Sequence, residues 1–201
     1  MLASSGNAWL ERKSEFMRRM VEDIEVGYLD WRVKRLLDAI NSRPKSYTTS
    51  SCSGRVCIID AIKPWERKES SVVFKKHDPI SSSELLRVLS TKPKHSYWLI
   101  VGGPILHVMC QDLEEVKFIL DCARRAGFKH SGITSVSDKG FLVELISSTQ
   151  LILPLTRGER VLLNLKEIEE VIALVNETLF DGWKRIDMLE KIIQSQEGEG
   201  A

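Results

Sequence analysis

The stretch Gly132–Leu155, GITSVSDKGFLVELISSTQLILPL, decides the fold class of this chain. Its apolar and β-branched runs predict successive strands at Gly132–Val136, Phe141–Ser147 and Gln150–Leu155. The first two runs are joined only by the turn sequence SDKG. Because these strands follow one another without an intervening helix, a strict alternation of strand and helix is excluded. The stretch therefore favours an α+β fold with a mixed or antiparallel sheet over a doubly wound, Rossmann-type fold.

The rest of the chain supplies helices and further strands around this stretch. Apolar residues at helical spacing and capping residues predict helices at Trp9–Glu25, after Asp30, after Ser81, from Asp112 to Gly127 and after Asn164. Further strands are expected at Val56–Ile62, Val72–His77, Tyr97–Val101 and Ile105–Cys110. The two strand-rich blocks that result indicate a possible internal duplication.

A length of 201 residues fits one large domain or two small interlocked ones. We predict a single domain over residues 1–194, with an N-terminal helical part (8–42), a sheet-rich part (47–155), a C-terminal helix (164–194) and a frayed tail (195–201). The longest apolar runs are far shorter than the roughly 18 residues that span a bilayer. The charged N-terminal segment also lacks the apolar core of a signal peptide. We therefore expect a cytoplasmic protein with no membrane contact.

The formal net charge of +1 hides an uneven distribution of charge. Residues 41–95 contain eleven Lys and Arg against five Asp and Glu, whereas residues 159–201 contain five against ten. This asymmetry permits a basic surface that meets phosphates, although solvated charged faces give the same pattern. The four cysteines form no C-x-x-C pair, so reduced thiols and no metal site are expected.

The segment Tyr47–Arg55, YTTSSCSGR, is the first candidate for function. It lies between a helix stopped by proline and a β-branched strand, so we expect a functional loop. Hydroxyl side chains such as Ser50, Ser51 and Ser53 let a backbone approach a polyanion, and Arg55 adds a charge suited to bidentate contacts. The spacing is not that of a P-loop, and a simple polar connector is the alternative.

Two further segments carry groups that suit chemistry, Pro104–Cys110 (PILHVMC) and Ala126–Ile133 (AGFKHSGI). Strand alternation places His107 on the face opposite Leu106 and Val108. His107 is either a hydrogen-bonded structural residue or a group that titrates in the range useful for catalysis. The turn of the second segment, which contains Lys129 and Ser131, suits a phosphate or carboxylate, although basic residues also answer the dipole of a helix end.

Three aromatic residues, Trp65, Tyr97 and Trp98, could stack on a nucleobase. The apolar run around Trp98 favours a place in the core for that side chain.

Taken together and in order, these segments resemble the tRNA wybutosine-synthesizing protein 3 family. The match consists of TTSSCSGR at Thr48–Arg55, PILHVMC at Pro104–Cys110, AGFKHSGI at Ala126–Ile133 and a strand that ends in LPL at Leu153–Leu155. The helix around Phe16, the Gly27–Asp30 step and the long C-terminal helix also fall where the family has them. The resemblance therefore covers nearly the whole chain.

The resemblance implies an enzyme that depends on S-adenosyl-L-methionine and methylates tRNA(Phe). The expected product carries a methyl group at N-4 of the tricyclic wyosine-type base made from guanosine 37, in the anticodon loop. We expect His107 to remove a proton or to orient the base, with Asp60 as a second candidate for this role. The residues expected to hold the nucleotide or the cofactor are Ser50, Ser51, Ser53, Arg55, Lys129 and Ser131.

Two other readings stay open at this point. One is a non-catalytic RNA-binding module that presents the anticodon loop to partner enzymes. The other is a phosphate-handling enzyme for small nucleotides, whose binding would lack the steep salt dependence of many RNA phosphate contacts.

Overall fold

The computed structural model describes residues 3–66 and 68–197. The chain alternates between two compact units: unit 1 comprises Met1–Ser53, Pro104–Ser148 and Trp183–Ala201, and unit 2 comprises Gly54–Gly103 and Thr149–Gly182. The sequence predicted a single domain over residues 1–194. The length of the chain also allowed two small interlocked units, and the division found here is of that second kind.

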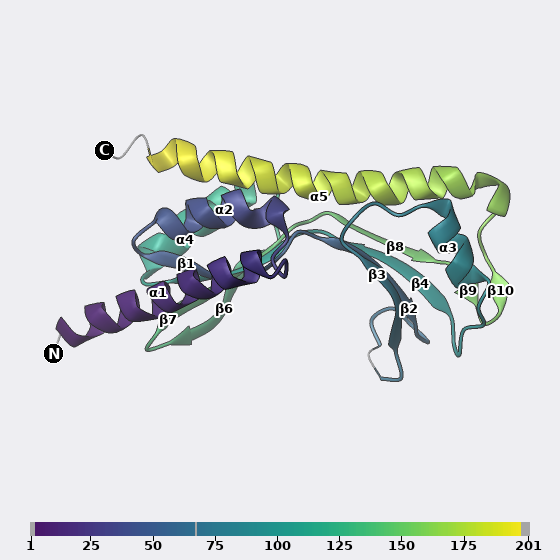
Figure 1. Ribbon diagram of the computed structural model, residues 1–201, viewed down its shortest axis with the longest axis horizontal. Coiled ribbons are helices and arrows are strands. Elements are labelled where there is room, and N and C mark those ends of the chain that lie inside the picture. The colour runs from purple at the N-terminus through teal and green to yellow at the C-terminus, as the bar shows by residue number, and fades with distance from the viewer. Residues whose placement is uncertain (1–2, 67, 198–201) are drawn as a thin grey trace. The chain divides into compact units, whose positions relative to one another are not determined.

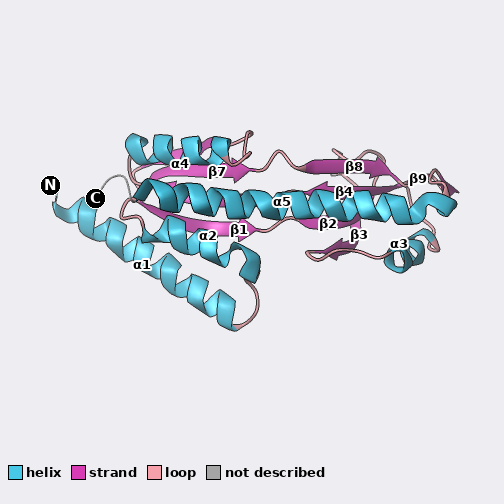
Figure 2. Cartoon of the chain, turned by 90° about the horizontal axis from the view of Figure 1, so that it is seen from above, coloured by secondary structure: helices cyan, strands magenta, loops and turns pink. Residues whose placement is uncertain are grey.

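Unit 1 is built on a four-stranded sheet with the order β1-β5-β7-β6, in which every neighbouring pair is antiparallel. Its strands are β1 (Ser46–Cys52), β5 (Ile105–Cys110), β6 (Gly132–Ser137) and β7 (Gly140–Ile146). Its helices are α1 (Ala3–Glu25), α2 (Trp31–Ser42), α4 (Leu113–Arg125) and the C-terminal half of α5 (Ile168–Glu197). Figures 1 and 2 show α2, α4 and this half of α5 over one face of the sheet.

The core of unit 1 lies between that face and the three helices. Fully buried side chains from the central strands and from the helices form one apolar cluster, which includes Leu106, Val108, Val143, Leu145, Leu36, Ile40, Ile119 and Leu189. The helix ends are set locally, as the sequence predicted. Asp30 accepts a hydrogen bond from the Arg32 amide at the start of α2, and Gly127 adopts a φ of +90° after α4.

Unit 2 contains a second four-stranded antiparallel sheet with the order β3-β2-β4-β8. The strands are β2 (Arg55–Asp60), β3 (Ser71–Lys76), β4 (Tyr97–Gly102) and β8 (Gln150–Pro154), with a short pair β9 (Thr156–Arg157) and β10 (Arg160–Val161). Helix α3 (Ser82–Leu89) begins with the predicted capping box of Ser81 and Glu84. Asn164 caps a short 3-10 turn (Leu165–Glu167) that leads into α5.

The α+β class with antiparallel sheets is confirmed, and every predicted strand is found within a few residues of its expected bounds. Two expectations were wrong. The segment Tyr47–Arg55 is not a loop, because β1 runs through Cys52 and β2 begins at Arg55. The helix α5 continues to Glu197, so Ser195–Glu197 are helical, and residues 198–201 lie outside the described part of the chain.

The two sheets have equal size but different connections. Unit 1 runs strand, helix and hairpin (β5, α4, β6, β7), whereas unit 2 runs hairpin, helix and strand (β2, β3, α3, β4). This reversed order gives the expected internal duplication no support.

Candidate active site

The unit 1 sheet has one face buried under helices and one face that is largely open. Along β5, Leu106, Val108 and Cys110 are buried, whereas Ile105, His107 and Met109 between them are only partly buried. This alternation confirms that His107 points away from the core. The open face of unit 1 is therefore where the candidate chemistry lies.

A β-bulge in β1 brings Ser50 to the same face as His107. Thr48 pairs with Val108 and Ser50 pairs with His107, so Thr49 is an extra residue that interrupts the alternation. Thr48 faces the core side, where its amide and hydroxyl hydrogen-bond to the Asn41 side chain. Without the bulge Ser50 would face the same side as Thr48. The bulge turns Ser50 outward.

A hydrogen bond joins Ser50 to His107, and an ion-pair contact joins His107 to Glu144, so the three side chains are linked across three neighbouring strands. The Ser50 Oγ atom lies 2.8 Å from His107 Nδ1, and His107 Nε2 lies 3.1 Å from Glu144 Oε1. Both the His107 and Glu144 side chains keep 30% of their surface exposed. A hydroxyl, an imidazole and a carboxylate linked in this order can accept, hold and pass on a proton.

Glu144 is a residue that the sequence analysis missed. It lies at an outward position of β7, directly opposite His107 in the register of the two strands. A single carboxylate within the otherwise apolar run FLVELI was the available signal. The signal gave no partner, because strand pairing between β5 and β7 cannot be deduced from one sequence.

Helix α1 covers one end of the open face and leaves the other end free. Trp9 and Phe16 pack on Tyr47, and their ring centroids lie 5.0 and 5.1 Å, respectively, from the centroid of the Tyr47 ring. Burial raises the pKa of the Tyr47 phenol, which keeps this side chain neutral. Tyr47 pairs with Met109 in β5, two residues beyond His107. The aromatic cluster therefore ends before the Ser50–His107–Glu144 chain.

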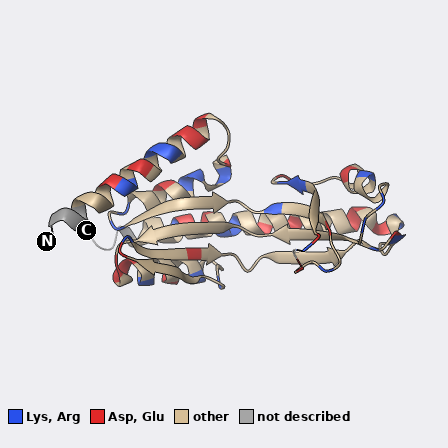
Figure 3. Cartoon of the chain, turned by 90° about the horizontal axis from the view of Figure 1, so that it is seen from below, with Lys and Arg blue, Asp and Glu red and all other residues tan. Residues whose placement is uncertain are grey.

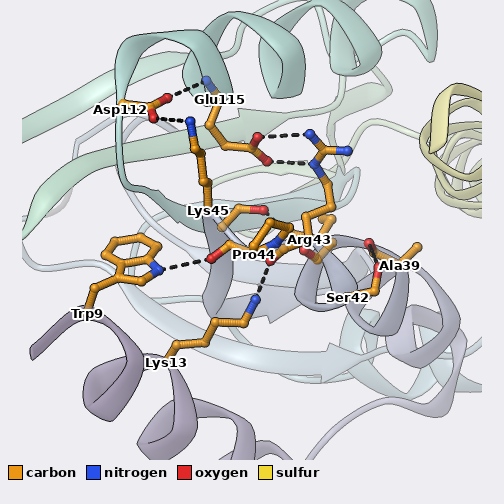
Figure 4. Close-up of polar contacts among 11 residues, drawn as sticks. Trp9, Lys13, Ala39, Ser42, Arg43, Pro44, Lys45, Asp112 and Glu115 are labelled. Atoms are coloured by element: carbon orange, nitrogen blue, oxygen red, sulfur yellow. Dashed lines mark hydrogen bonds and ion pairs between the residues drawn. The ribbon is translucent and has the colours of Figure 1, made fainter. Parts of the chain in front are cut away.

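A polar network fixes the start of β1 and so its register (Figure 4). Arg43 makes a bidentate pair with the buried Glu115 carboxylate, with N–O distances of 2.6 and 2.9 Å. Lys45 pairs with Asp112 at 2.8 Å, and the Trp9 indole donates to the Pro44 carbonyl at 3.0 Å. These contacts hold the turn between α2 and β1 against both α1 and α4, because Trp9 lies in α1, whereas Glu115 and the N-cap residue Asp112 belong to α4.

The third motif, Ala126–Ile133, contacts the same sheet and supports its structure. The Ser131 hydroxyl donates to the Phe128 carbonyl at 2.7 Å and accepts from the Ile146 amide at 3.1 Å. It thereby ties the turn after α4 to the end of β7, two residues from Glu144. Lys129 is exposed on that turn.

The other predicted site residues of the first motif do not join the chain. Ser51 pairs with Leu106 and so faces the core side of the sheet. Ser53 is fully buried, and its hydroxyl donates to the Asp30 carboxylate. Both residues are better explained as parts of the scaffold that carries Ser50.

Arg55 and Asp60 belong to unit 2. Arg55 is exposed at the start of β2. Asp60 is buried, and its carboxylate accepts hydrogen bonds from the amides of Lys94, His95 and Ser96 at 2.5 to 3.1 Å. A carboxylate that already serves three amides holds a turn, so we remove Asp60 from the candidate bases.

Other features of the described residues give no competing site. No group of three His, Cys, Asp or Glu in residues 3–66 and 68–197 is placed to hold a metal ion. A shallow groove in unit 1 is lined by Arg35, Asp38, Ala39, Ser42, Glu190 and Gln194, and it contains none of the predicted site residues.

No helix in the described part of the chain is long and apolar enough to cross a lipid bilayer.

Comparison with known proteins defines the class of protein that carries this fold and site. The family described as Methyltransferase TYW3 matches residues 11–195, so the chain belongs to that family and is a methyltransferase.

Individual relatives cover nearly the whole chain. A protein of Saccharolobus solfataricus named tRNA(Phe) 7-((3-amino-3-carboxypropyl)-4-demethylwyosine(37)-N(4))-methyltransferase is 37% identical over 188 residues, which span 93% of this chain and 90% of that protein. A protein of the same name from Archaeoglobus fulgidus is 31% identical over 96% of this chain and 97% of its own length. A solved structure from Pyrococcus horikoshii has a TM-score of 0.85 at 25% identity, covering 94% of this chain and 96% of that one.

Proposed function

We propose that the protein transfers a methyl group from S-adenosyl-L-methionine to N-4 of the tricyclic wyosine-type base at position 37 of tRNA(Phe). The observation that carries the proposal is the exposed Ser50–His107–Glu144 chain, on a fold whose named relatives methylate that nitrogen. The three motifs of the resemblance contribute Ser50, His107 and the turn at Ser131 to one sheet.

The contacts of His107 with Ser50 and Glu144 support a proton-accepting role for one of its ring nitrogens. When a methyl group replaces the hydrogen on a ring nitrogen, one proton must leave. We assign the proton of the neutral imidazole to Nε2, which lies 3.1 Å from the Glu144 carboxylate, and the lone pair to Nδ1, which faces the Ser50 hydroxyl. Nδ1 therefore accepts the substrate proton, either directly or through Ser50. Glu144 stabilises the imidazolium that forms.

We propose that the open face of unit 1 holds the methyl donor. S-adenosyl-L-methionine supplies an electrophilic methyl group on a sulfonium, together with an adenine, a ribose and an amino acid group. Ile105 and Ile146 are partly buried cross-strand neighbours at the free end of this face and would pack against the adenine. Glu144 would attract the positively charged groups, and Lys129 would meet the carboxylate. Positioning of donor and acceptor supplies most of the rate in such a transfer.

The direct test measures tritium transfer from labelled S-adenosyl-L-methionine to the purified precursor tRNA. We expect transfer by the wild type and its loss in single turnovers of His107→Ala. Ser50→Ala removes the hydroxyl that contacts His107. Ser53→Ala is the matched control, because it removes a hydroxyl that is buried away from His107. Ser50→Ala should slow the transfer at an unchanged melting temperature.

Two results would contradict the proposal. Binding of the tRNA without any transfer would favour a non-catalytic RNA-binding module. Unchanged single-turnover transfer by His107→Ala would remove His107 from the chemistry and leave the substrate assignment to stand on the relatives alone.

A further inference from the structure

Unit 2 has an open sheet face of its own. Along β2 and β4 the residues Val56, Ile58, Leu99 and Val101 are buried, whereas the residues between them face outward. Figure 2 shows the N-terminal half of α5 over one side of these strands, and Figure 3 shows the strands from the opposite side. The outward positions used here, which we call the unit 2 face, are Cys57, Ile59, Lys75, Trp98, Ile100 and Ile152.

The apolar part of the unit 2 face is continuous across strands. Ile59 pairs with Trp98, Cys57 pairs with Ile100, and Ile100 pairs with Ile152 in the antiparallel register. Ile152 is 41% exposed, and the other four side chains are partly buried. A contiguous apolar patch that reaches solvent marks a candidate recognition surface.

The indole of Trp98 is held in place on this face. Its Nε1–H donates to the Ala61 carbonyl at 3.1 Å, where the loop after β2 begins. The sequence favoured a core position for Trp98, but the register places it outward beside Ile59. In the same loop Trp65 is exposed, and the Lys63 ammonium lies 5.9 Å from its ring centroid. A ring that is held in place and an exposed ring with a cation beside it both suit stacking on nucleobases.

The charge of the face is of one sign. Lys75 pairs with Cys57, and Arg55 occupies the outward position two residues before Cys57. Both are exposed, and neither makes an ion pair among the described residues. None of the outward positions of β2, β3, β4 or β8 carries Asp or Glu. The face therefore attracts anions.

We propose that the unit 2 face binds a single-stranded segment of the RNA substrate, with bases against Trp98 and the isoleucines and phosphates against Arg55 and Lys75. The apolar centre alone would equally suit a protein partner. Cations without a single carboxylate at the outward positions favour a polyanion with flat apolar groups, which describes single-stranded RNA. This inference rests on the proposed function for the identity of the RNA.

The test measures the affinity of the full chain for a fluorescent anticodon stem-loop of tRNA(Phe) at several salt concentrations. The double variant Arg55→Gln, Lys75→Gln removes two charges from the face, and Arg87→Gln removes one from the exposed side of α3 as the control. Each lost contact to a single-strand phosphate lowers the slope of log affinity against log salt by about 0.7, so the double variant should lose about 1.4. Arg87→Gln should keep the wild-type slope.

A second variant addresses the apolar centre without a buried substitution. Ile152→Glu places a negative charge at an exposed position of the edge strand β8 and should weaken RNA binding at an unchanged melting temperature. Wild-type affinity and slope in both face variants would overturn the inference. A self-association that Ile152→Glu abolishes while RNA affinity stays intact would also overturn it and assign the face to a second copy of the chain.

The outcome is independent of the methylation test. RNA that binds through the unit 2 face without receiving a methyl group would contradict the proposed function alone. Methyl transfer by a wild type whose face variants bind RNA normally would contradict this inference alone.

Discussion

The two open sheet faces of this protein are built from sheets of the same size and carry different kinds of surface. On unit 1 the outward positions of the central strands hold His107 and Glu144, and a bulge adds Ser50. On unit 2 the corresponding central positions hold Ile59, Trp98 and other apolar residues. Helix α1 covers one end of the first face with Trp9.

The comparison shows which side chains make a sheet face suitable for catalysis. Antiparallel pairing places outward side chains about 5 Å apart in either sheet. A proton-passing chain arises only where three such positions are a hydroxyl, an imidazole and a carboxylate. The same geometry with apolar residues and two flanking cations gives a binding surface instead.

The largest expected effect separates the two faces by their role in the chemical step. His107→Ala should lower single-turnover methyl transfer by about 10²- to 10⁴-fold, because general base catalysis contributes that much. RNA affinity, measured on the same preparation by anisotropy, should stay at the wild-type value. Equal losses of transfer and affinity would make the unit 1 face a binding surface like the other one.

The second difference is that aromatic side chains of α1 cover part of the unit 1 face. We therefore expect substitutions on the two faces to lower the free energy of unfolding by different amounts. Trp9→Ala should lower the free energy of unfolding by about 3 to 5 kcal/mol, because it removes a buried indole that packs on Tyr47 and donates to Pro44. Ile152→Ala on the uncovered face should cost about 0.5 kcal/mol, as at other partly exposed positions. Urea denaturation, monitored by circular dichroism, measures both free energies of unfolding. Similar losses for the two variants would contradict the exposure of Ile152 on the unit 2 face.

The turn glycines give a smaller contrast between the units. Gly140 in unit 1 has a φ of +120°, and a Cβ there would lie 2.4 Å from the Cys110 carbonyl oxygen. Gly158 in unit 2 has a φ of +58° and no atom within 4 Å of that position. We expect Gly140→Ala to cost about 3 kcal/mol and Gly158→Ala about 1 kcal/mol. Equal denaturation midpoints for the two variants would contradict this.

The last expected difference is in thiol reactivity, and it leaves stability and activity unchanged. Cys52 and Cys57 lie at outward positions of the two open faces, whereas Cys110 and Cys122 lie in the unit 1 core. Burial, with the nearby Glu115 and Asp112 carboxylates, raises the pKa of Cys110 to about 12. Alkylation needs the thiolate, so at pH 8 the native protein should react first at Cys52 and Cys57.

The pH dependence of Cys110 alkylation follows from the raised pKa. The reactive fraction should increase about tenfold per pH unit up to about 12, as long as the protein stays folded. Mass spectrometry of the alkylated peptides reads out each site. Bound RNA should slow the reaction of Cys57, and a rate for Cys57 that ignores RNA would count against the unit 2 face.

The sequence by itself determined the outward direction of His107 and the secondary structure, except for Tyr47–Arg55 and the end of α5. Alternation along Ile105–Cys110 sufficed for that direction, and the caps at Asp30 and Ser81 are local interactions between residues close in the chain. The ordered motifs also identified the family, because three of them at compatible spacing are specific where one is weak.

Only the tertiary structure decided which of these residues meet. In the Ser50–His107–Glu144 chain, strand pairing brings together Ser50 and His107, which are 57 positions apart, and His107 and Glu144, which are 37 positions apart. No local rule specifies such partners. The bulge at Thr49 reverses the alternation of β1, so Ser50 faces His107 while Ser51 faces the core. The same pairing surrounds Asp60 with three amides and turns Trp98 outward. Sequence periodicity sets the direction of a side chain, but its partner depends on long-range pairing.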